Sequence, residues 1–223
     1  EIILPILEEY NLPPELFYVP MIESGFKSDA RSFAAAVGPW QFIESTAKAF
    51  GLKKDFYYDE RRDIIKSTHA ACKYLKYLYE EFDDWYLAFA AYNCGVTRVL
   101  KEIKRSKSSN FWDLKRLPSQ TRNYVPKILA IFIISQNPEK YGFIINPDDD
   151  FNWVEKQLTK QVAFKDISQI TGVDVKTLHE YNPEIRRAIL PPLKEDEVYN
   201  FRLPNNTYVS FDSLFTLLNS KKT

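Results

Sequence analysis

An apolar stripe along residues 63–82 constrains the fold of this chain more than any other stretch. Apolar and small side chains recur there at three- and four-residue steps: Ile64, Thr68, Ala71, Leu75, Leu78 and Phe82. This spacing brings the side chains to one face of a helix. A helix with such a face must cover it against other helices, so the stripe predicts a helical domain.

Helix caps and further periodic runs extend the helical prediction to about residue 145. Residues 85–92 read as a helix that Gly95 ends. Another helix starts at Ser119, a good N-cap residue, and runs toward Asn137. Shorter helices are predicted at residues 1–10, 14–24 and 45–50.

The pattern changes at residues 144–150, an acidic stretch with a proline that is typical of a linker. Beyond it the sequence predicts strand, helix, helix and strand, at residues 151–163, 165–170, 175–181 and 197–203, with Pro204 ending the last. Residues 209–218 place Phe211, Leu214, Phe215 and Leu218 on one helical face, and we expect this tail to pack on the body. A length of 223 residues suits one sizeable core and a small second domain.

Composition argues against several classes of function. The 30 basic and 30 acidic residues cancel, so nothing indicates the phosphate attraction of a nucleic-acid-binding protein. Cys72 and Cys94 are the only cysteines, and we expect buried free thiols rather than a disulfide or a zinc-type site. His69 and His179 have no nucleophile nearby in sequence, which leaves a Ser-His or Cys-His triad unsupported. No metal or cofactor is predicted.

Glu23 is a carboxylate set among apolar side chains, in the run Met21-Ile22-Glu23-Ser24-Gly25-Phe26. Burial disfavours the charged form, so this setting should raise the pKa of Glu23 and keep a proton available near neutral pH, as a general acid requires. Pro20 lacks a backbone N–H, and we expect it to kink the helix just before Glu23 and aim the carboxylate into a cleft. The alternative is a solvated glutamate at a helix end, which carries no chemistry.

Two further polar clusters interrupt stretches that should otherwise be core. In Gly38-Pro39-Trp40-Gln41-Phe42 an amide lies between two large aromatic side chains, and the alternative is a loop with a buried Trp. In Ala90-Ala91-Tyr92-Asn93-Cys94-Gly95 small residues let helices approach while Tyr92 and Asn93 emerge at the helix end. A helix C-cap made of Asn and Gly explains this second cluster equally well.

Taken in order, the clusters resemble a known family. Glu-Ser-x-Phe at 23–26, Gly-x-Trp-Gln-Phe at 38–42, Ala-Tyr-Asn-x-Gly at 91–95 and Thr-Arg-Asn-Tyr-Val-Pro at 121–126 are similar to the motifs of family 1 lytic transglycosylases of the lysozyme-like superfamily, most closely the membrane-bound MltD subgroup. Segments 58–63, 74–78, 111–114 and 137–142 also look like that subgroup. The resemblance covers about residues 5–145, and it implies a lysozyme-like (goose-type, SLT) helical catalytic domain at 1–145 within a mainly α protein.

The resemblance also implies roles for individual residues. Glu23 matches the single catalytic acid and base, with Ser24 beside it to hydrogen-bond the carboxylate or the sugar. Tyr124 matches a tyrosine near the catalytic glutamate. The positions that match residues lining or shaping the glycan cleft are Trp40, Gln41, Phe42, Tyr92 and Asn93. Pro39 and Cys94 depart from the commoner residues of the family, but neither change removes a group that the chemistry requires.

Residues 146–205 are similar to a lysin-motif (LysM) module, a small α+β unit of the order βααβ. The run Leu178-His179-Glu180-Tyr181-Asn182-Pro183 resembles its Leu-x-x-x-Asn-Pro turn, whereas the usual Gly-Asp-Thr-Leu opening is missing. We therefore expect a degenerate module that supports the catalytic domain, the alternative being weak glycan binding. Residues 206–223 are expected to form a C-terminal helical tail.

The function implied by the resemblance is non-hydrolytic cleavage of the MurNAc-GlcNAc β-1,4 bond of peptidoglycan, which leaves 1,6-anhydroMurNAc ends. Hydrolysis usually needs a second carboxylate. The nearby candidates in sequence, Asp29, Glu44, Asp59 and Asp63, each suit a solvated charge or a helix cap. The alternatives are a goose-type muramidase, which hydrolyses, and a non-catalytic peptidoglycan-binding protein.

The expected partner is the peptidoglycan glycan strand, and the expected compartment follows from it. The substrate implies the periplasm or cell envelope, with the chain acting as a monomer. No apolar stretch is long enough to span a bilayer. Because the chain begins at Glu1 rather than Met, we expect a processed or trimmed form, and anchoring to the outer membrane would need a segment before it.

Overall fold

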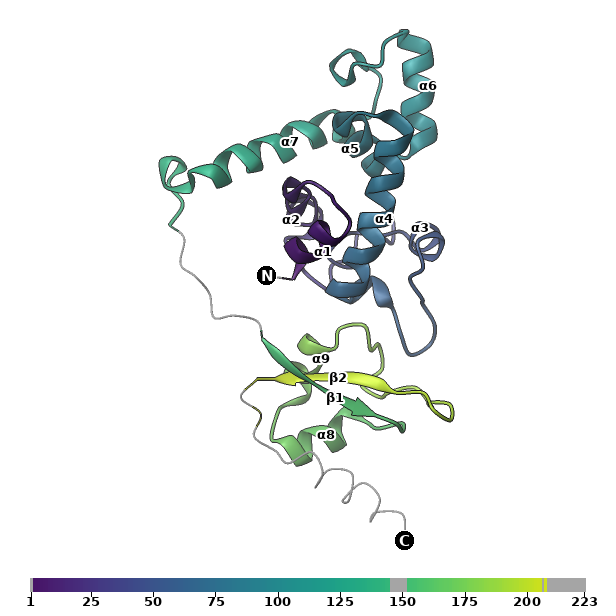
Figure 1. Cartoon of the computed structure of the whole chain (residues 1–223), viewed down its shortest axis with the longest axis vertical. Coiled ribbons are helices and arrows are strands. Elements are labelled where there is room, and N and C mark those ends of the chain that lie inside the picture. Colours follow the sequence, from purple (N-terminus) through teal and green to yellow (C-terminus); the bar gives the residue numbers. More distant parts are fainter. Residues whose placement is uncertain (1, 145–151, 206, 208–223) are drawn as a thin grey trace.

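The computed structural model describes residues 2–144, 152–205 and 207. A helical body is followed by a small module of two strands and two helices, which lies beneath the body in Figure 1. The prediction of a mainly α fold with a βααβ module is confirmed. The predicted tail helix at 209–218 and most of the predicted linker fall outside the described residues.

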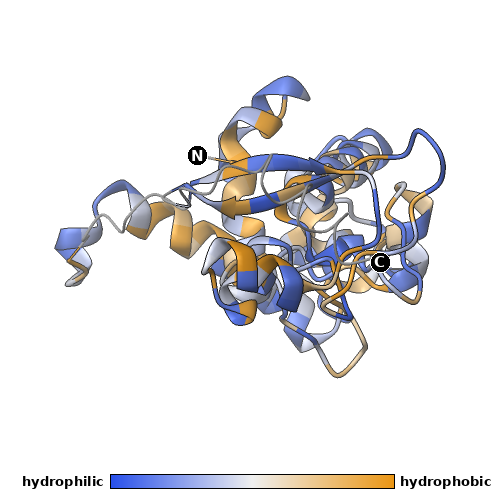
Figure 2. Cartoon of the chain, turned by 90° about the horizontal axis from the view of Figure 1, so that it is seen from below, coloured by the Kyte–Doolittle hydropathy of each residue, from blue (hydrophilic) through white to orange (hydrophobic). Residues whose placement is uncertain are grey.

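Helix α4 (Ile64–Phe82) realises the apolar stripe that the sequence shows. Asp63 caps its N-terminus, since the carboxylate accepts a hydrogen bond from the backbone N–H of Lys66 at 2.7 Å. Its buried face packs against α1 (Ile3–Glu9) and α5 (Trp85–Cys94). The helices of the body carry hydrophobic and hydrophilic stretches in alternation (Figure 2), as helices with one buried face should.

Helix α5 is the centre of the body. It contacts α4, α6 (Val96–Ser106) and α7 (Ser119–Gln136), and its three alanines Ala88, Ala90 and Ala91 are fully buried. Small side chains allow these helices to approach closely. The remaining elements of the body are η1 (Pro14–Phe17), α2 (Tyr18–Ser24), α3 (Glu44–Ala49), η2 (Glu60–Arg62), η3 (Phe111–Asp113) and η4 (Pro138–Tyr141).

Three local features of the body differ from what the sequence predicted. The helix expected at 14–24 is divided, because the 3₁₀ turn η1 ends at Phe17 and α2 begins at Tyr18. Pro20 lies in the first turn of α2, where a missing N–H costs no helical hydrogen bond. Ser119 is the first helical residue of α7, and Pro118 occupies the N-cap position without a side-chain bond. Helix α6 was not expected from the sequence at all.

The module consists of β1 (Trp153–Leu158), α8 (Phe164–Thr171), α9 (Val175–Tyr181) and β2 (Tyr199–Pro204). The strands pair antiparallel, with Trp153 opposite Pro204 and Leu158 opposite Tyr199. Asn182, at the end of α9, accepts from the backbone N–H of Arg202 at 2.9 Å and donates to its carbonyl at 2.8 Å. This buried amide ties α9 to β2 above a core of Phe164, Ile167, Leu178 and Phe201.

Among the described residues, no helix combines the length and apolar character needed to cross a bilayer. Within the same residues, no group of three or more histidine, cysteine or acidic side chains is placed to hold a metal ion.

Candidate active site

Glu23 lies in a cleft of about 410 Å³ between the end of α2, the loop before α3 and the end of α5. The cleft lining comprises Glu23, Ser32, Ala34, Ala36, Gln41, Phe42, Ile43, Thr46, Tyr74, Tyr92, Asn93, Cys94, Gly95 and Gln120. Of the residues that the sequence singled out, five line the cleft: Glu23, Gln41, Phe42, Tyr92 and Asn93. Segments far apart in the chain therefore meet at one carboxylate.

The Glu23 carboxyl is placed by the last turn of α2 and by a contact from α7. Gly25 follows in the left-handed conformation, with a φ of 61°, and ends the helix just after Glu23. The hydroxyl of Tyr124 donates to Glu23 Oε1 at 2.6 Å. Burial raises the pKa of Glu23 from its ordinary 4.5 to about 7, while the bond from Tyr124 acts in the lowering direction. A carboxyl of this kind can hold a proton at neutral pH and release it.

Residues 35–42 form one edge of the cleft, and we call them the cleft loop. Gly38 has a φ of 85°, and a Cβ added to it would lie 1.8 Å from the carbonyl oxygen of Arg61, so only glycine fits. Gln41, with a φ of 49°, donates from Nε2 to the Gly38 carbonyl at 2.8 Å and to the Ala30 carbonyl at 3.2 Å. The amide thus holds the loop in shape while the side chain borders the cleft.

Two residues do not lie as the resemblance implied. Trp40 is fully buried and donates from Nε1 to Thr68 at 2.9 Å, so its ring belongs to the core and not to the cleft wall. The Ser24 hydroxyl donates to the Pro39 carbonyl at 2.8 Å and lies 3.3 Å from that of Pro20. It therefore bonds the backbone of the cleft loop rather than the Glu23 carboxylate.

The end of α5 supplies the opposite edge of the cleft. Tyr92 donates its hydroxyl to the Trp40 carbonyl at 2.7 Å, and burial raises the pKa of this phenol. Asn93 accepts from the Thr121 hydroxyl at 2.8 Å. Gly95, with a φ of 89°, ends the helix as predicted. Trp40 is therefore tied to α4 through its ring nitrogen and to α5 through its carbonyl.

Tyr74 and Cys94 line the cleft although the sequence analysis gave neither a place in the site. The Tyr74 ring packs against Phe42 and Tyr92, with ring centroids 6.2 and 5.3 Å away, and burial raises its pKa to about 12. Tyr74 belongs to segment 74–78, which resembles the family, but the resemblance gave it no role in the site. Cys72 and Cys94 are free thiols, as predicted, although only Cys72 is fully buried.

Glu23 is the only carboxylate among the described residues that line the cleft. The four other acidic candidates do not line it. Glu44 pairs with Lys54, Asp59 with Arg61, and Asp63 with Arg202. Asp29 borders a different cavity, together with Arg62 and His179.

Comparison with known proteins places this chain in a family. Residues 3–115 match the family model described as "Transglycosylase SLT domain", and residues 155–219 match "Lytic transglycosylase MltD, LysM-like domain". Over 190 residues the chain is 38% identical to the membrane-bound lytic murein transglycosylase D of Escherichia coli, and this match covers 82% of the chain and 42% of that protein. The chain thus spans less than half the length of this relative.

Solved structures support the fold alone. The lytic transglycosylase Slt of Pseudomonas aeruginosa, solved as an inactive mutant, is 24% identical with a TM-score of 0.52, over 62% of this chain and 24% of that one. The 70-kDa soluble lytic transglycosylase in complex with bulgecin A is 21% identical with a TM-score of 0.50, over 60% and 24%. With its helical body matched over residues 3–115, the chain belongs to the transglycosylase SLT domain family.

Proposed function

We propose that the chain is a peptidoglycan lytic transglycosylase that cleaves the MurNAc-GlcNAc β-1,4 bond without water and leaves 1,6-anhydroMurNAc ends. One observation carries the proposal. A single partly buried carboxyl, Glu23, with a pKa raised to about 7, stands in the cleft with a hydroxyl donor at 2.6 Å. The similarity to the lytic murein transglycosylase of Escherichia coli supports the substrate class.

In the first step, protonated Glu23 donates its proton to the glycosidic oxygen as the bond to C1 of MurNAc breaks. The carboxylate that forms accepts the Tyr124 hydrogen bond, which strengthens as charge develops on Oε1. The same carboxylate then takes the proton of the MurNAc C6 hydroxyl as that oxygen attacks C1. The ring closes, Glu23 is protonated again, and no water enters the balance.

The cleft lining suits a sugar chain. Phe42, Tyr74 and Tyr92 provide an aromatic wall, and Gln41 and Asn93 bring amide groups to the two edges. Flat aromatic surfaces pack on the C–H faces of pyranose rings, while amides bond their hydroxyl groups. These five residues are the proposed glycan-binding set, and Ser24 is assigned to holding the cleft loop.

The alternative enzyme is a goose-type muramidase, which would hydrolyse the same bond. Inverting and retaining hydrolases usually place a second carboxylate roughly 5–9 Å from the acid. Among the described residues that line the cleft there is none beside Glu23, which favours ring closure over hydrolysis. A non-catalytic binding protein is disfavoured because a buried acid with a hydroxyl donor has no use in binding alone.

The proposed partner is therefore the glycan strand, and the proposed site of action is the cell envelope, where peptidoglycan lies. The description "membrane-bound" is part of the name of the Escherichia coli relative and is not carried over to this chain.

Glu23→Gln tests the assignment because it keeps the shape of the side chain and removes the transferable proton. We expect no release of soluble glycan fragments from purified peptidoglycan, with an unchanged circular dichroism spectrum. Glu44→Gln is the matched control, since Glu44 pairs with Lys54 outside the cleft, and it should cleave at the wild-type rate. A Glu23→Gln variant with normal turnover would refute the proposal.

A further inference from the structure

The two ends of the cleft loop are held by one buried guanidinium. Arg61, with 4% of its surface exposed, donates from Nη1 to the carbonyl of Phe42 at 3.1 Å and to that of Ala35 at 3.3 Å. Its own carbonyl lies against Gly38. Arg61 therefore contacts the cleft loop at both ends and in the middle.

Asp59 orients this guanidinium. Its two carboxylate oxygens accept from Nε and Nη2 of Arg61 at 2.8 and 2.7 Å, and both side chains are buried. A two-pronged pairing of this kind fixes the plane of the guanidinium and directs the remaining nitrogen. Nη1 is the nitrogen that reaches the cleft loop.

The C-terminal module forms hydrogen bonds with the chain immediately before Arg61. The backbone N–H of Asp59 donates to the Glu184 carbonyl at 2.9 Å, and that of Arg186 donates to the Tyr57 carbonyl at 2.7 Å. Tyr58 forms a β-bridge with Ile185. The Tyr58 ring also stacks on Tyr199 of β2, with centroids 5.9 Å apart.

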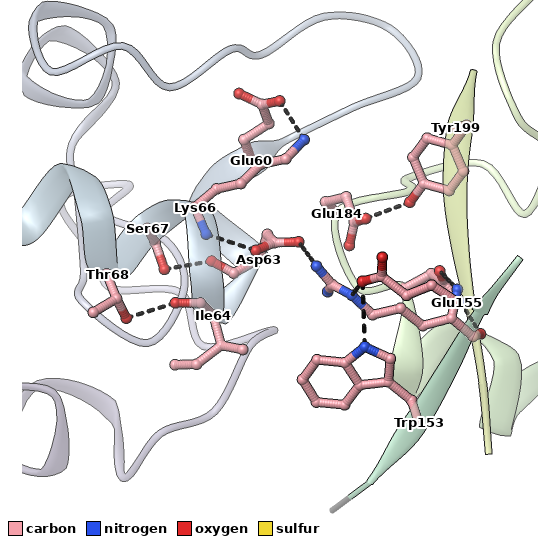
Figure 3. Close-up of polar contacts among 12 residues, drawn as sticks. Glu60, Asp63, Ile64, Lys66, Ser67, Thr68, Trp153, Glu155, Glu184 and Tyr199 are labelled. Atoms are coloured by element: carbon pink, nitrogen blue, oxygen red, sulfur yellow. Dashed lines mark hydrogen bonds and ion pairs between the residues drawn. The ribbon is translucent and has the colours of Figure 1, made fainter. Parts of the chain in front are cut away.

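The module also contacts the chain shortly after Arg61, through an ion pair. Arg202 of β2 forms an ion pair with Asp63 at 2.8 Å, and Asp63 is fully buried. Figure 3 shows Asp63, at the start of α4, facing Glu184 and Glu155 across the interface. Arg202 Nε lies 3.6 Å from Glu155 Oε1. Glu184 accepts a hydrogen bond from the Tyr199 hydroxyl. Segment 57–63, with Arg61 inside it, is thus fixed to the module on both sides.

We propose that the Asp59–Arg61 pair is a positioning device through which docking of the C-terminal module sets the geometry of the cleft loop. The inference rests on the proposed function for its kinetic consequence and names a role for the module in that reaction. Arg61 touches no reacting atom, because it acts through the carbonyls of Ala35 and Phe42. Between these two residues in the chain lie Gln41 and Trp40, whose carbonyl accepts the hydrogen bond from Tyr92. A module that is docked keeps segment 57–63, and hence the guanidinium, in place.

Arg61→Lys tests the positioning residue, because lysine keeps the charge beside Asp59 but cannot form the fork and reach two carbonyls at once. We expect the backbone amides of residues 35–42 to exchange hydrogen at least 10-fold faster and peptidoglycan cleavage to fall about 10-fold or more. The pH at which the rate declines should stay at the wild-type value, since Glu23 and Tyr124 are untouched.

Arg105→Lys is the matched control for this variant. It makes the same change at a side chain on α6 that pairs with Glu102 and does not line the cleft. Wild-type exchange and cleavage are expected for it. Wild-type exchange at 35–42 in folded Arg61→Lys, or an equal effect of both variants, would overturn the inference.

Arg202→Met tests the coupling, because it leaves Asp63 and Glu184 buried without their cation and should loosen the module. Arg202 has no contact with the cleft loop among its described interactions, yet we expect faster exchange at 57–63 and at 35–42 together. Faster exchange at 57–63 with full protection at 35–42 would contradict the coupling. Hydrogen exchange needs no turnover, so a wild-type protein that fails to cleave peptidoglycan would refute only the proposed function.

Discussion

The Glu23 carboxyl is subject to two opposing influences. Burial raises its pKa to about 7, and the hydrogen bond from Tyr124 acts to lower it. The apolar neighbours in the local sequence predicted the direction of the first. Tyr124 lies 101 residues further along the chain, so no local pattern could supply the second, and only the resemblance placed it near Glu23.

Glu23→Gln should stabilise the protein above neutral pH. The pKa of Glu23 is higher in the folded protein, about 7, than its ordinary 4.5, so folding loses stability as the pH rises between these values. Glutamine carries no such loss, and the variant should gain about 3 kcal/mol at pH 8 and almost nothing at pH 4. Urea unfolding at the two pH values measures this gain. An equal gain at both would show that folding does not raise the pKa of Glu23.

Tyr124→Phe should change the pH profile of cleavage. Removing the hydroxyl removes an influence that lowers the pKa of Glu23, so the decline in rate should move from about pH 7 to higher pH. The rate at the optimum should fall about 10- to 100-fold, because a hydrogen bond to a charged group contributes about 1.5–3 kcal/mol. Tyr86→Phe, on α5 but outside the cleft, is the control and should keep the wild-type profile.

Side-chain direction is the residue-scale property that the sequence conceals most. Trp40 and Ser24 stand in the right motifs, yet Trp40 turns toward Thr68 in the core and Ser24 toward the Pro39 carbonyl. Both orientations depend on elements that pack from elsewhere in the chain. Motif matching placed these residues near the site and could not say which way they point.

At the scale of elements, periodicity and caps predicted the long helices and missed α6. Gly95 reads as the end of α5, and it is, but with a φ of 89° it is also the N-cap of α6. Val96, Val99 and Ile103 follow at helical spacing within a basic stretch, and they were the available signal. Because the same glycine ends α5 and precedes α6, we interpreted it only as a helix end and did not predict the second helix.

Gly38→Ala should be among the more damaging single-methyl changes in the body. The added Cβ would meet the Arg61 carbonyl at 1.8 Å, and the φ of 85° disfavours any side chain, so we expect a loss on the order of 2–4 kcal/mol. Gly51→Ala is the matched control, because Gly51 has a φ of 90° with open space around it, and it should lose only about 1 kcal/mol. Thermal unfolding compares the stability of the two variants. Equal losses would mean that the close approach of the Arg61 carbonyl to Gly38 does not add to the cost of the substitution.

At the scale of the whole molecule, the sequence predicted two parts but not how they join. The order βααβ follows from local patterns, whereas the pairing of Tyr58 with Ile185 and of Asp63 with Arg202 links segments more than 120 residues apart. No periodicity or cap signals such contacts. The supporting role expected for the module fits this docking, and it stays a proposal until the exchange experiments are done.

The central claim is that one carboxylate performs both proton transfers, and the product reports on it directly. Mass spectrometry of soluble fragments from purified peptidoglycan separates anhydro ends from reducing ends, because the two differ by one water. With Glu23 as the only carboxylate among the described residues of the cleft, we predict anhydroMurNAc ends. Fragments that carry only reducing ends would contradict this account and identify a hydrolase.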